Sequence, residues 1–405
     1  MTASSRLTQL PFRLVVSIAF LNAVGALATD LYLPAFPEMA AELGGDASGA
    51  QLTLTAFLVG VAVGQLVLGF VSDRWGRRRP LIAGAVVCAL ASGALVLAPG
   101  LPFLLVARFV QGAAGAAGMV IGRAIIADLV SGRSAARAFS LMLTVGGLAP
   151  IVAPVLGGLL VGPIGWRGIL AVLFGLTVAM VAVVVLVIPE TLPVERRTKP
   201  RASTRSDQPD IPGLRGLVSP VFLGNAAMSI CCFAVLLAYI SASPFLYEEL
   251  LGLTPEGYGV AFAGNSVALV AGTFTSARLV RRFRPRAVLT VGMAIMITSI
   301  VSIAVIAFGD VGRIGLAVSL PALLFGFGLV QGNAAAAAIT SVPRAAGAAS
   351  AVIGCGQFSV SAVSAALVGV GGSDAVVSLA VVLIGCLLLM LAAHRLSRTT
   401  DALGA

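Results

Sequence analysis

Few side chains in this sequence could do chemistry, and the most unusual is a carboxylate in an apolar run. Asp30 follows the uncharged stretch 14–29, which is nearly long enough to cross a membrane. A carboxylate in such a segment costs several kcal/mol unless it is neutralised or paired. Desolvation favours its protonated form and a nearby cation favours its ionised form, so its proton can come and go. We therefore predict that Asp30 carries protons; a hydrated position near the outer surface, close to Pro34, is the alternative.

Four further polar residues within apolar runs are candidates for a binding cavity. Arg108 keeps its proton in proteins, and its side chain either stays inside the protein or extends to the outer interface. Gln111 and Gln331 each precede a glycine. Each amide could bond a substrate or a neighbouring helix, which is the commoner role of such groups in membranes. Tyr239 is a weaker candidate for the same cavity.

The sequence lacks the residues that most enzyme mechanisms require. The one histidine is His394, and the one lysine is Lys199, which Pro200 follows. The five cysteines show no CxxC spacing, so the sequence predicts no metal site and no histidine-dependent hydrolase. A P-loop needs Gly-Lys-Ser/Thr, and no such run occurs. We therefore expect no nucleotide and no cofactor.

The composition identifies the environment of these residues. Of the 405 residues, 59% are hydrophobic and 10% are charged, with a mean hydropathy of +1.06, whereas soluble domains are about 25% charged. A spanning helix needs about 20 apolar residues. Apolar runs bounded by charge, Gly or Pro predict twelve spans, near 14–36, 51–71, 80–98, 102–128, 137–161, 168–188, 217–241, 255–277, 287–308, 314–336, 346–369 and 375–393.

The basic residues indicate how these spans are oriented. A net charge of +10 would suggest nucleic acid as a partner of a soluble protein. Here, however, 22 of the 26 basic residues fall at the two ends and in alternate loops. Because cytoplasmic loops are enriched in Lys and Arg, this pattern places both termini in the cytoplasm. We predict a multi-pass membrane protein that binds no nucleic acid.

The chain divides into two related halves. A polar segment at 189–216 separates residues 1–188 from residues 217–405, and each half holds six predicted spans. Gln111-Gly112 in the fourth span recurs as Gln331-Gly332 in the tenth. Such duplication is typical of transporters with a site between the repeats. The predicted fold class is an all-α membrane protein of twelve transmembrane helices, in two pseudo-symmetric six-helix halves joined by a cytoplasmic linker.

The loop after the second span carries a longer motif. Residues 69–79 read GFVSDRWGRRR, which resembles the signature Gly-x-x-x-Asp-x-x-Gly-Arg-Lys/Arg of the major facilitator superfamily (MFS) in the same loop. We expect its first glycine to allow close helix contact and its second to form a tight turn. Its aspartate is expected to pair with arginines, in a latch that breaks during transport. The predicted latch residues are Gly69, Asp73, Gly76, Arg77, Arg78 and Asp128; for Arg79, contact with anionic lipid is the preferred interpretation.

Other segments are similar to the Bcr/CflA group of twelve-span drug:proton antiporters within this superfamily. They are DLYLPAFP from Asp30, RFVQG from Arg108 and YISASPF from Tyr239. Ser276 stands where the first half has Asp73, so any latch in the second half is expected to be weaker or different. The fifth span resembles the motif that marks exporters of this superfamily, at Gly146, Pro150, Pro154, Gly157 and Gly158.

This resemblance implies that spans one, four, seven and ten line a central cavity, which Arg108 and Asp30 would share. It also implies proton-coupled efflux of small, partly lipophilic drugs or antibiotics across the bacterial inner membrane by alternating access. The expected partners are a small-molecule substrate, protons and the lipid bilayer, and the expected functional unit is a monomer. An MFS transporter of an endogenous metabolite, such as an amino acid or sugar derivative, is the alternative. A membrane enzyme is disfavoured because a catalytic His or Lys is lacking and buried carboxylates are scarce.

Overall fold

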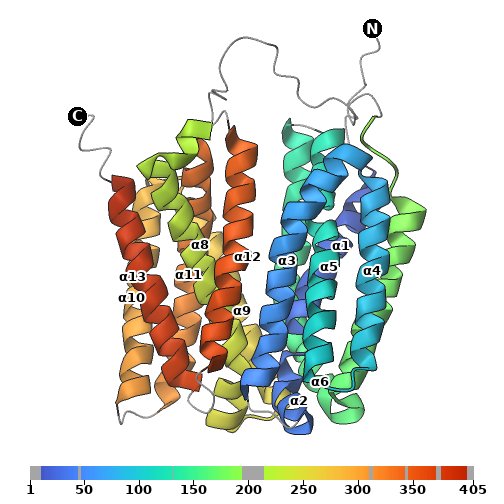
Figure 1. The fold of residues 1–405 in the computed structure, drawn as a ribbon. Coiled ribbons are helices and arrows are strands. Elements are labelled where there is room, and N and C mark those ends of the chain that lie inside the picture. Colours follow the sequence, from blue (N-terminus) through green and yellow to red (C-terminus); the bar gives the residue numbers. More distant parts are fainter. Residues whose placement is uncertain are drawn as a thin grey trace, which may run out of the picture. The chain divides into compact units, whose positions relative to one another are not determined.

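The computed structural model describes residues 11–43, 47–130, 132–193, 214–309, 313–342, 345–370 and 375–398, which are almost entirely helical (Figure 1). The longer helices are α1 (Phe12–Asp30), α3 (Ala47–Trp75), α4 (Arg78–Val96), α5 (Leu101–Leu129), α6 (Gly132–Val187), α8 (Pro220–Pro244), α9 (Pro255–Leu279), α10 (Pro285–Phe308), α11 (Leu316–Ser341), α12 (Ala346–Val370) and α13 (Ala375–Arg398). The short elements are η1 (Leu33–Ala35), α2 (Phe36–Glu42), η2 (Leu214–Val218), the π-helix η3 (Phe245–Leu250) and η4 (Arg313–Gly315).

The helices account for all twelve predicted spans. Among the described residues, eleven helical segments are long and apolar enough to cross a membrane. One of them, Arg137–Val187, has 51 residues and holds two predicted spans. Gly165 separates these two, because its φ of 64° lies in the left-handed region that glycine enters without steric cost. The prediction of an all-α membrane protein with twelve spans is confirmed.

The first predicted span, 14–36, is not one continuous helix. α1 ends at Asp30, a 3-10 turn follows and α2 begins at Phe36. Pro34 lies in that turn; a proline has no N–H to donate and disfavours the helical conformation of the residue before it. Asp30 is therefore the last residue of a helix and not a mid-helix residue.

The chain forms two compact units by its internal contacts. The first unit comprises Met1–Ala35 and Ala56–Ser206, and the second comprises Phe36–Thr55 and Asp207–Ala405. These bounds differ from the predicted halves because the segment Phe36–Thr55 groups with the second unit. Of the predicted linker 189–216, residues 194–213 lie outside the described residues.

Two contacts show how the segment Phe36–Thr55 packs in the second unit. Nε2 of Gln51 donates to the backbone oxygen of Ser241 at 3.0 Å, and the ring of Phe36 lies 6.2 Å from that of Phe245. The amide of Phe245 bonds Ala242 instead of Ser241. Gln51 thus satisfies a carbonyl near the end of α8, where buried backbone groups need a partner.

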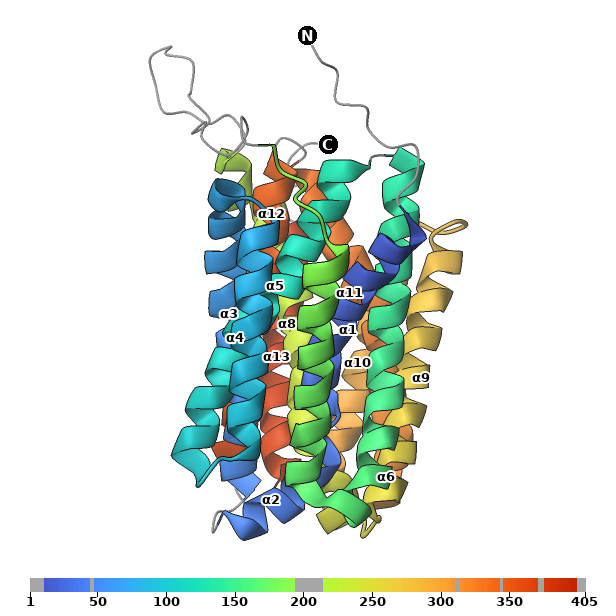
Figure 2. The same ribbon diagram turned by 90° about the vertical axis from the view of Figure 1, so that its right-hand side faces the viewer.

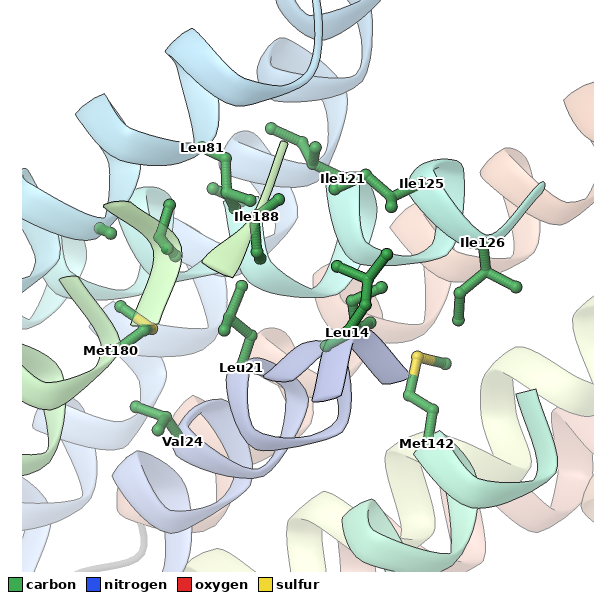
Figure 3. Close-up of a cluster of buried hydrophobic side chains, with 14 of the residues drawn as sticks. Leu14, Leu21, Val24, Leu81, Ile121, Ile125, Ile126, Met142, Met180 and Ile188 are labelled. Carbon is green, nitrogen blue, oxygen red and sulfur yellow. The ribbon is translucent and has the colours of Figure 1, made fainter. Parts of the chain in front are cut away.

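Each unit has its own apolar core. In the first unit, side chains of α1, α4, α5 and α6 form one cluster, with Leu21, Ile121 and Met180 among its members (Figure 3). In the second unit, residues of α8, α11 and α12 form a smaller cluster around Phe222. Large apolar side chains such as Phe70 remain exposed (78%), as expected for helix faces that contact lipid tails, which are as apolar as leucine.

Candidate functional site

Asp30, at the end of α1, is buried. The residue is 2% exposed, and its Oδ1 has no hydrogen-bond partner among the described residues. The C-terminal end of a helix carries the negative end of its dipole. An ionised carboxylate is therefore disfavoured here both by the loss of water and by the helix itself, and a proton on Asp30 removes both costs.

Arg108 of α5 is buried beside the same end of α1. Its Nη1 donates to the backbone oxygen of Ala28 at 3.1 Å and to Oε1 of Gln111 at 2.8 Å. Its Cζ lies 3.7 Å from the centroid of the Tyr32 ring, a cation–π contact. Arg108 is 1% exposed. Its side chain therefore does not extend to the surface of the protein, in contrast to the alternative of an arginine that reaches the outer interface. Among the described residues, Arg108 and Asp30 form no ion pair with each other.

Gln111 connects this cluster to α4. Its Nε2 donates to Oγ of Ser92 at 2.8 Å, and that hydroxyl donates to the backbone oxygen of Cys88 at 2.7 Å. A buried chain of hydrogen bonds thus runs from α1 through Arg108 and Gln111 to α4. Both ends of the Gln111 amide are used inside the protein, which favours the helix–helix role over direct substrate contact in this structure.

α6 packs along α1 (Figure 2), and a glycine sets the contact closest to Asp30. A Cβ at Gly157 would overlap the backbone oxygen of Leu31 and lie 3.1 Å from Cγ of Pro34. No side chain larger than hydrogen fits there without moving one of the two backbones. The exporter motif of α6 therefore touches the chain directly after Asp30.

The rest of that motif continues the contact along α6. A Cβ at Gly146 would lie 2.5 Å from Nδ2 of Asn22 in α1. Pro150 and Pro154 lie inside the helix, and Gly158 is buried. A proline inside a helix removes one backbone hydrogen bond and promotes bending, so this stretch combines close packing with a weakened helix.

The loop between α3 and α4 is closed around one arginine. Nε of Arg77 donates to Oδ2 of Asp128 at 2.8 Å, and its Nη1 donates to Oδ1 of Asp73 at 2.5 Å and to Oγ of Ser72 at 2.9 Å. Gly76 makes the turn, with a φ of 92°. Burial lowers the pKa of the Arg77 guanidinium, but the hydrogen bonds and charges of Asp128 and Asp73 raise it more, so the net pKa lies above its ordinary value.

Glu190 completes this loop, and sequence reasoning missed it. Its carboxylate accepts hydrogen bonds from the backbone N–H groups of Arg77 at 2.8 Å and of Arg78 at 3.3 Å. These groups lie at the start of α4, where the helix dipole favours a negative charge. Nη2 of Arg78 also donates to the backbone oxygen of Val185 at 2.8 Å. Glu190 falls in the predicted linker, and its place as the first charge after an apolar run was the only signal.

The close approach expected at Gly69 does not occur. A Cβ there would meet only Cγ1 of Val120 at 3.9 Å, an ordinary van der Waals distance. The close contact lies earlier in α3, where Cβ atoms at Gly60 and Gly64 would overlap backbone oxygens of α5. A methyl group at this position would fit without moving α5, so Gly69 is not required for the packing of these two helices.

Tyr239, in the second unit, lies in a buried cluster of tyrosines. Nδ2 of Asn265 in α9 donates to the hydroxyls of Tyr239 at 2.7 Å and Tyr247 at 2.5 Å. The Tyr258 hydroxyl bonds Oγ of Ser243 at 3.0 Å. Three of the chain's four tyrosines thus meet at the contact of α8, η3 and α9, and Tyr239 is 0% exposed.

Gln331 in α11 does not repeat the contacts of Gln111. Its Nε2 donates to Oγ of Ser229 in α8 at 3.2 Å, and Nε2 of Gln357 in α12 donates to the same oxygen at 3.1 Å. Oε1 of Gln331 is buried without a partner among the described residues. The second glutamine therefore keeps one acceptor for a further donor.

In the second unit, a hydrogen bond between uncharged side chains occupies the position that corresponds to the charged loop of the first unit. Oγ of Ser276 accepts from Nδ2 of Asn333 at 2.9 Å. In the first unit, by contrast, Arg77 forms ion pairs with both Asp73 and Asp128. Ser276 thus takes part in a hydrogen bond that replaces the charge pairing of Asp73.

The sequence matches known transporters over most of its length. Residues 18–365 match the family model described as Major Facilitator Superfamily. The chain belongs to this superfamily. The MFS-type transporter YdgK of Bacillus subtilis is 32% identical over 364 residues, covering 89% of each chain. The bicyclomycin resistance protein homolog of Haemophilus influenzae is 29% identical over 357 residues, covering 88% of this chain and 89% of the relative. The multidrug resistance protein MdtL of Klebsiella pneumoniae is 26% identical, covering 88% of each chain.

Solved MFS structures share the fold. A bacterial homologue of the human lysosomal transporter Spinster, inward-facing and unoccupied, superposes with a TM-score of 0.73 at 12% identity, covering 96% of each chain. The nucleoside transporter NupG superposes with a TM-score of 0.73 at 13% identity, covering 95% of this chain and 99% of that chain. The resemblance to Bcr/CflA-type MFS proteins is confirmed by the relatives, and the protein is a multi-pass membrane transporter and not an enzyme.

Proposed function

We propose that this MFS transporter exports small, partly lipophilic drugs or antibiotics across the bacterial inner membrane in exchange for protons. The names of two relatives, a bicyclomycin resistance protein homolog and a multidrug resistance protein, support the substrate class. The distribution of basic residues supports an orientation with both termini in the cytoplasm. The proposed unit is a monomer with the halves 1–188 and 217–405, which works by alternating access.

The observation that carries proton coupling is the buried Oδ1 of Asp30, which lacks a partner among the described residues. A buried, unpaired carboxylate is costly, so the carboxyl group holds a proton while it is enclosed. Access to water, or the approach of the Arg108 cation, favours release of that proton. Asp30 can therefore alternate between two forms as its surroundings change, which is what exchange of protons for substrate requires.

Arg108, Gln111, Gln331 and Tyr239 each hydrogen-bond other groups of the protein, so we propose that they exchange these partners for substrate. Arg108 would release the Ala28 carbonyl or Gln111, and Gln331 offers its unpartnered Oε1. Tyr239 would act through its hydroxyl, which now accepts from Asn265. Each exchange replaces an internal hydrogen bond by one to the substrate, at little net cost.

We further propose that two motifs control the change of conformation. The loop held by Asp73, Gly76, Arg77, Arg78 and Asp128 is a bonded state that must break, and Gly69 belongs to the same motif by sequence. The exporter motif of α6 would transmit movement to the chain after Asp30, because Gly157 contacts Leu31. Its residues are Gly146, Pro150, Pro154, Gly157 and Gly158.

The test separates transport from its coupling to protons. In proteoliposomes, Asp30→Asn should keep counterflow of a labelled drug but lose accumulation driven by a pH gradient, and drug addition should no longer release protons. Glu249→Gln changes an exposed carboxylate and should behave as wild type. Normal pH-driven accumulation by the Asp30→Asn protein would place the proton carrier elsewhere.

The substrate class needs its own measurement. A susceptibility panel that includes bicyclomycin, in a host without other efflux pumps, should show resistance on expression of the wild-type chain and less with Asp30→Asn. Unchanged susceptibility together with counterflow of an amino acid or a sugar derivative would favour the metabolite transporter instead.

A further inference from the structure

A groove in the first unit joins an apolar wall to one cation. Residues of α3, α4 and α5, which lie next to one another in Figure 1, line a cavity of about 670 Å³, within the size range of small-ligand sites. Val63, Val67, Val87 and Phe109 are among the apolar lining residues, and each of the three helices also contributes glycine or alanine to the lining. Trp75 and Arg79, which flank the loop between α3 and α4, line the groove as well.

Arg79 differs from the two arginines before it. The guanidinium of Arg77 is bonded to Asp128, and that of Arg78 to the backbone oxygen of Val185. Arg79 is exposed and makes no hydrogen bond or ion pair with the described residues. It is the one charged residue of the groove lining, in which no carboxylate is present to neutralise it.

A second groove, without charged or aromatic lining residues, allows a comparison with the groove of the first unit. Residues of α12 and α13 in the second unit line a cavity of about 830 Å³. Its lining includes Val360, Leu367, Val381 and Leu389 but no charged and no aromatic residue. A lipid tail suits both grooves, whereas only the groove of the first unit also offers a cation and an indole ring.

We propose that the groove between α3, α4 and α5 binds one anionic phospholipid, with an acyl chain along its apolar wall and the phosphate at Arg79. Indole rings favour the level of the lipid headgroups, which suits Trp75 beside that phosphate. Basic residues next to a membrane span attract anionic lipids, which are enriched in the cytoplasmic leaflet. In the orientation proposed above, Arg79 faces that leaflet. This site is independent of the transported drug and of Asp30.

The chain supplies its own reporter for this lipid. It has two tryptophans; Trp75 is 62% exposed in the groove, and Trp166 is 2% exposed. The purified full-length protein is reconstituted in dioleoyl-phosphatidylcholine that contains either dibrominated phosphatidylglycerol or dibrominated phosphatidylcholine. Bromine quenches only nearby tryptophans, so the difference between wild type and Trp75→Phe reports the lipid in the groove.

For wild type, we expect the relative binding constant of phosphatidylglycerol over phosphatidylcholine to be about five-fold, the effect of one cation at a membrane surface. Arg79→Gln should bring this ratio close to one. Arg281→Gln removes an exposed charge of the second unit and should leave it unchanged. Ala83→Phe fills the exposed wall of the groove and should reduce quenching by both lipids. Size-exclusion elution and counterflow confirm that each variant is folded.

Three results would overturn the proposal. A wild-type ratio near one means that the groove holds bulk lipid without selection. A ratio that survives Arg79→Gln, or that falls equally with Arg281→Gln, means that diffuse charge attracts the lipid. Relief of the quenching by a saturating transported drug means that the groove is an entry site for substrate. If Ala83→Phe fails to fold, the comparison of Arg79→Gln with Arg281→Gln still decides.

Discussion

At the scale of single residues, burial separates the two carboxylates that share Arg77. The side chain of Asp128 is 18% exposed, and that of Asp73 is 69% exposed. Exposed ion pairs contribute about 0–1 kcal/mol, whereas a hydrogen bond to a charged group away from water contributes about 1.5–3 kcal/mol. Asp73, the aspartate of the sequence motif, therefore contributes less to the free energy of folding through Arg77 than Asp128 does.

We expect Asp128→Asn to lower the free energy of unfolding by about 2 kcal/mol, and Asp73→Asn by less than about 1 kcal/mol. Chemical denaturation of the purified protein in detergent measures both. Arg74→Gln, which removes an exposed arginine that forms no ion pair with the described residues, is the control. Equal losses for the two aspartates would mean that burial does not set their contributions.

At the scale of helices, the close contact between α1 and α6 requires a residue without a Cβ atom at position 157. A Cβ at Gly157 would overlap the Leu31 carbonyl oxygen, while a Cβ at Gly162, less than two turns further along α6, would meet nothing within 4 Å. Substitution by alanine should therefore lower the stability of the protein at Gly157 and raise it at Gly162. Only the first must displace a neighbouring backbone.

Gly157→Ala should lower the apparent melting temperature and slow efflux, because α6 must move away from the chain after Asp30. Gly162→Ala should leave efflux unchanged and raise stability by up to about 1 kcal/mol, since alanine is the better helix former. Thermal unfolding monitored by fluorescence-detected size exclusion compares them. A Gly157→Ala protein as stable as wild type would show that the two helices can separate freely.

The sequence was sufficient to predict helices but not their contacts. The length of an apolar run decides whether a segment can cross a membrane, so the spans were predictable. The end of α1 was missed because apolar residues continue through the turn at Pro34. Gln111 and Gln331 have the same following residue, yet one bonds a serine of α4 and the other a serine of α8. Such partners depend on packing, which no pattern within one helix encodes.

At the scale of the whole molecule, the charge distribution predicts which loops face the cytoplasm. In a variant without native cysteines, Arg282→Cys should react with a membrane-impermeant maleimide only after the cells are opened. Glu249→Cys should react in intact cells, because its loop is predicted to face outwards. Both residues are exposed, so accessibility alone does not separate them. Labelling in the reverse pattern would invert the proposed orientation.

The hydrogen bonds of Glu190 also determine where the polypeptide tolerates a break. Its carboxylate caps the start of α4, so a fragment that ends beyond residue 193 contains the side chains of Asp73, Arg77, Asp128 and Glu190, which close this loop among the described residues. A break before Glu190 would instead leave those N–H groups uncapped. The first fragment would also carry Phe36–Thr55, whose Gln51 bonds the backbone of α8. Two co-expressed fragments divided within 194–213 would thus have a built-in docking segment, and the protein could serve as a split reporter of membrane assembly.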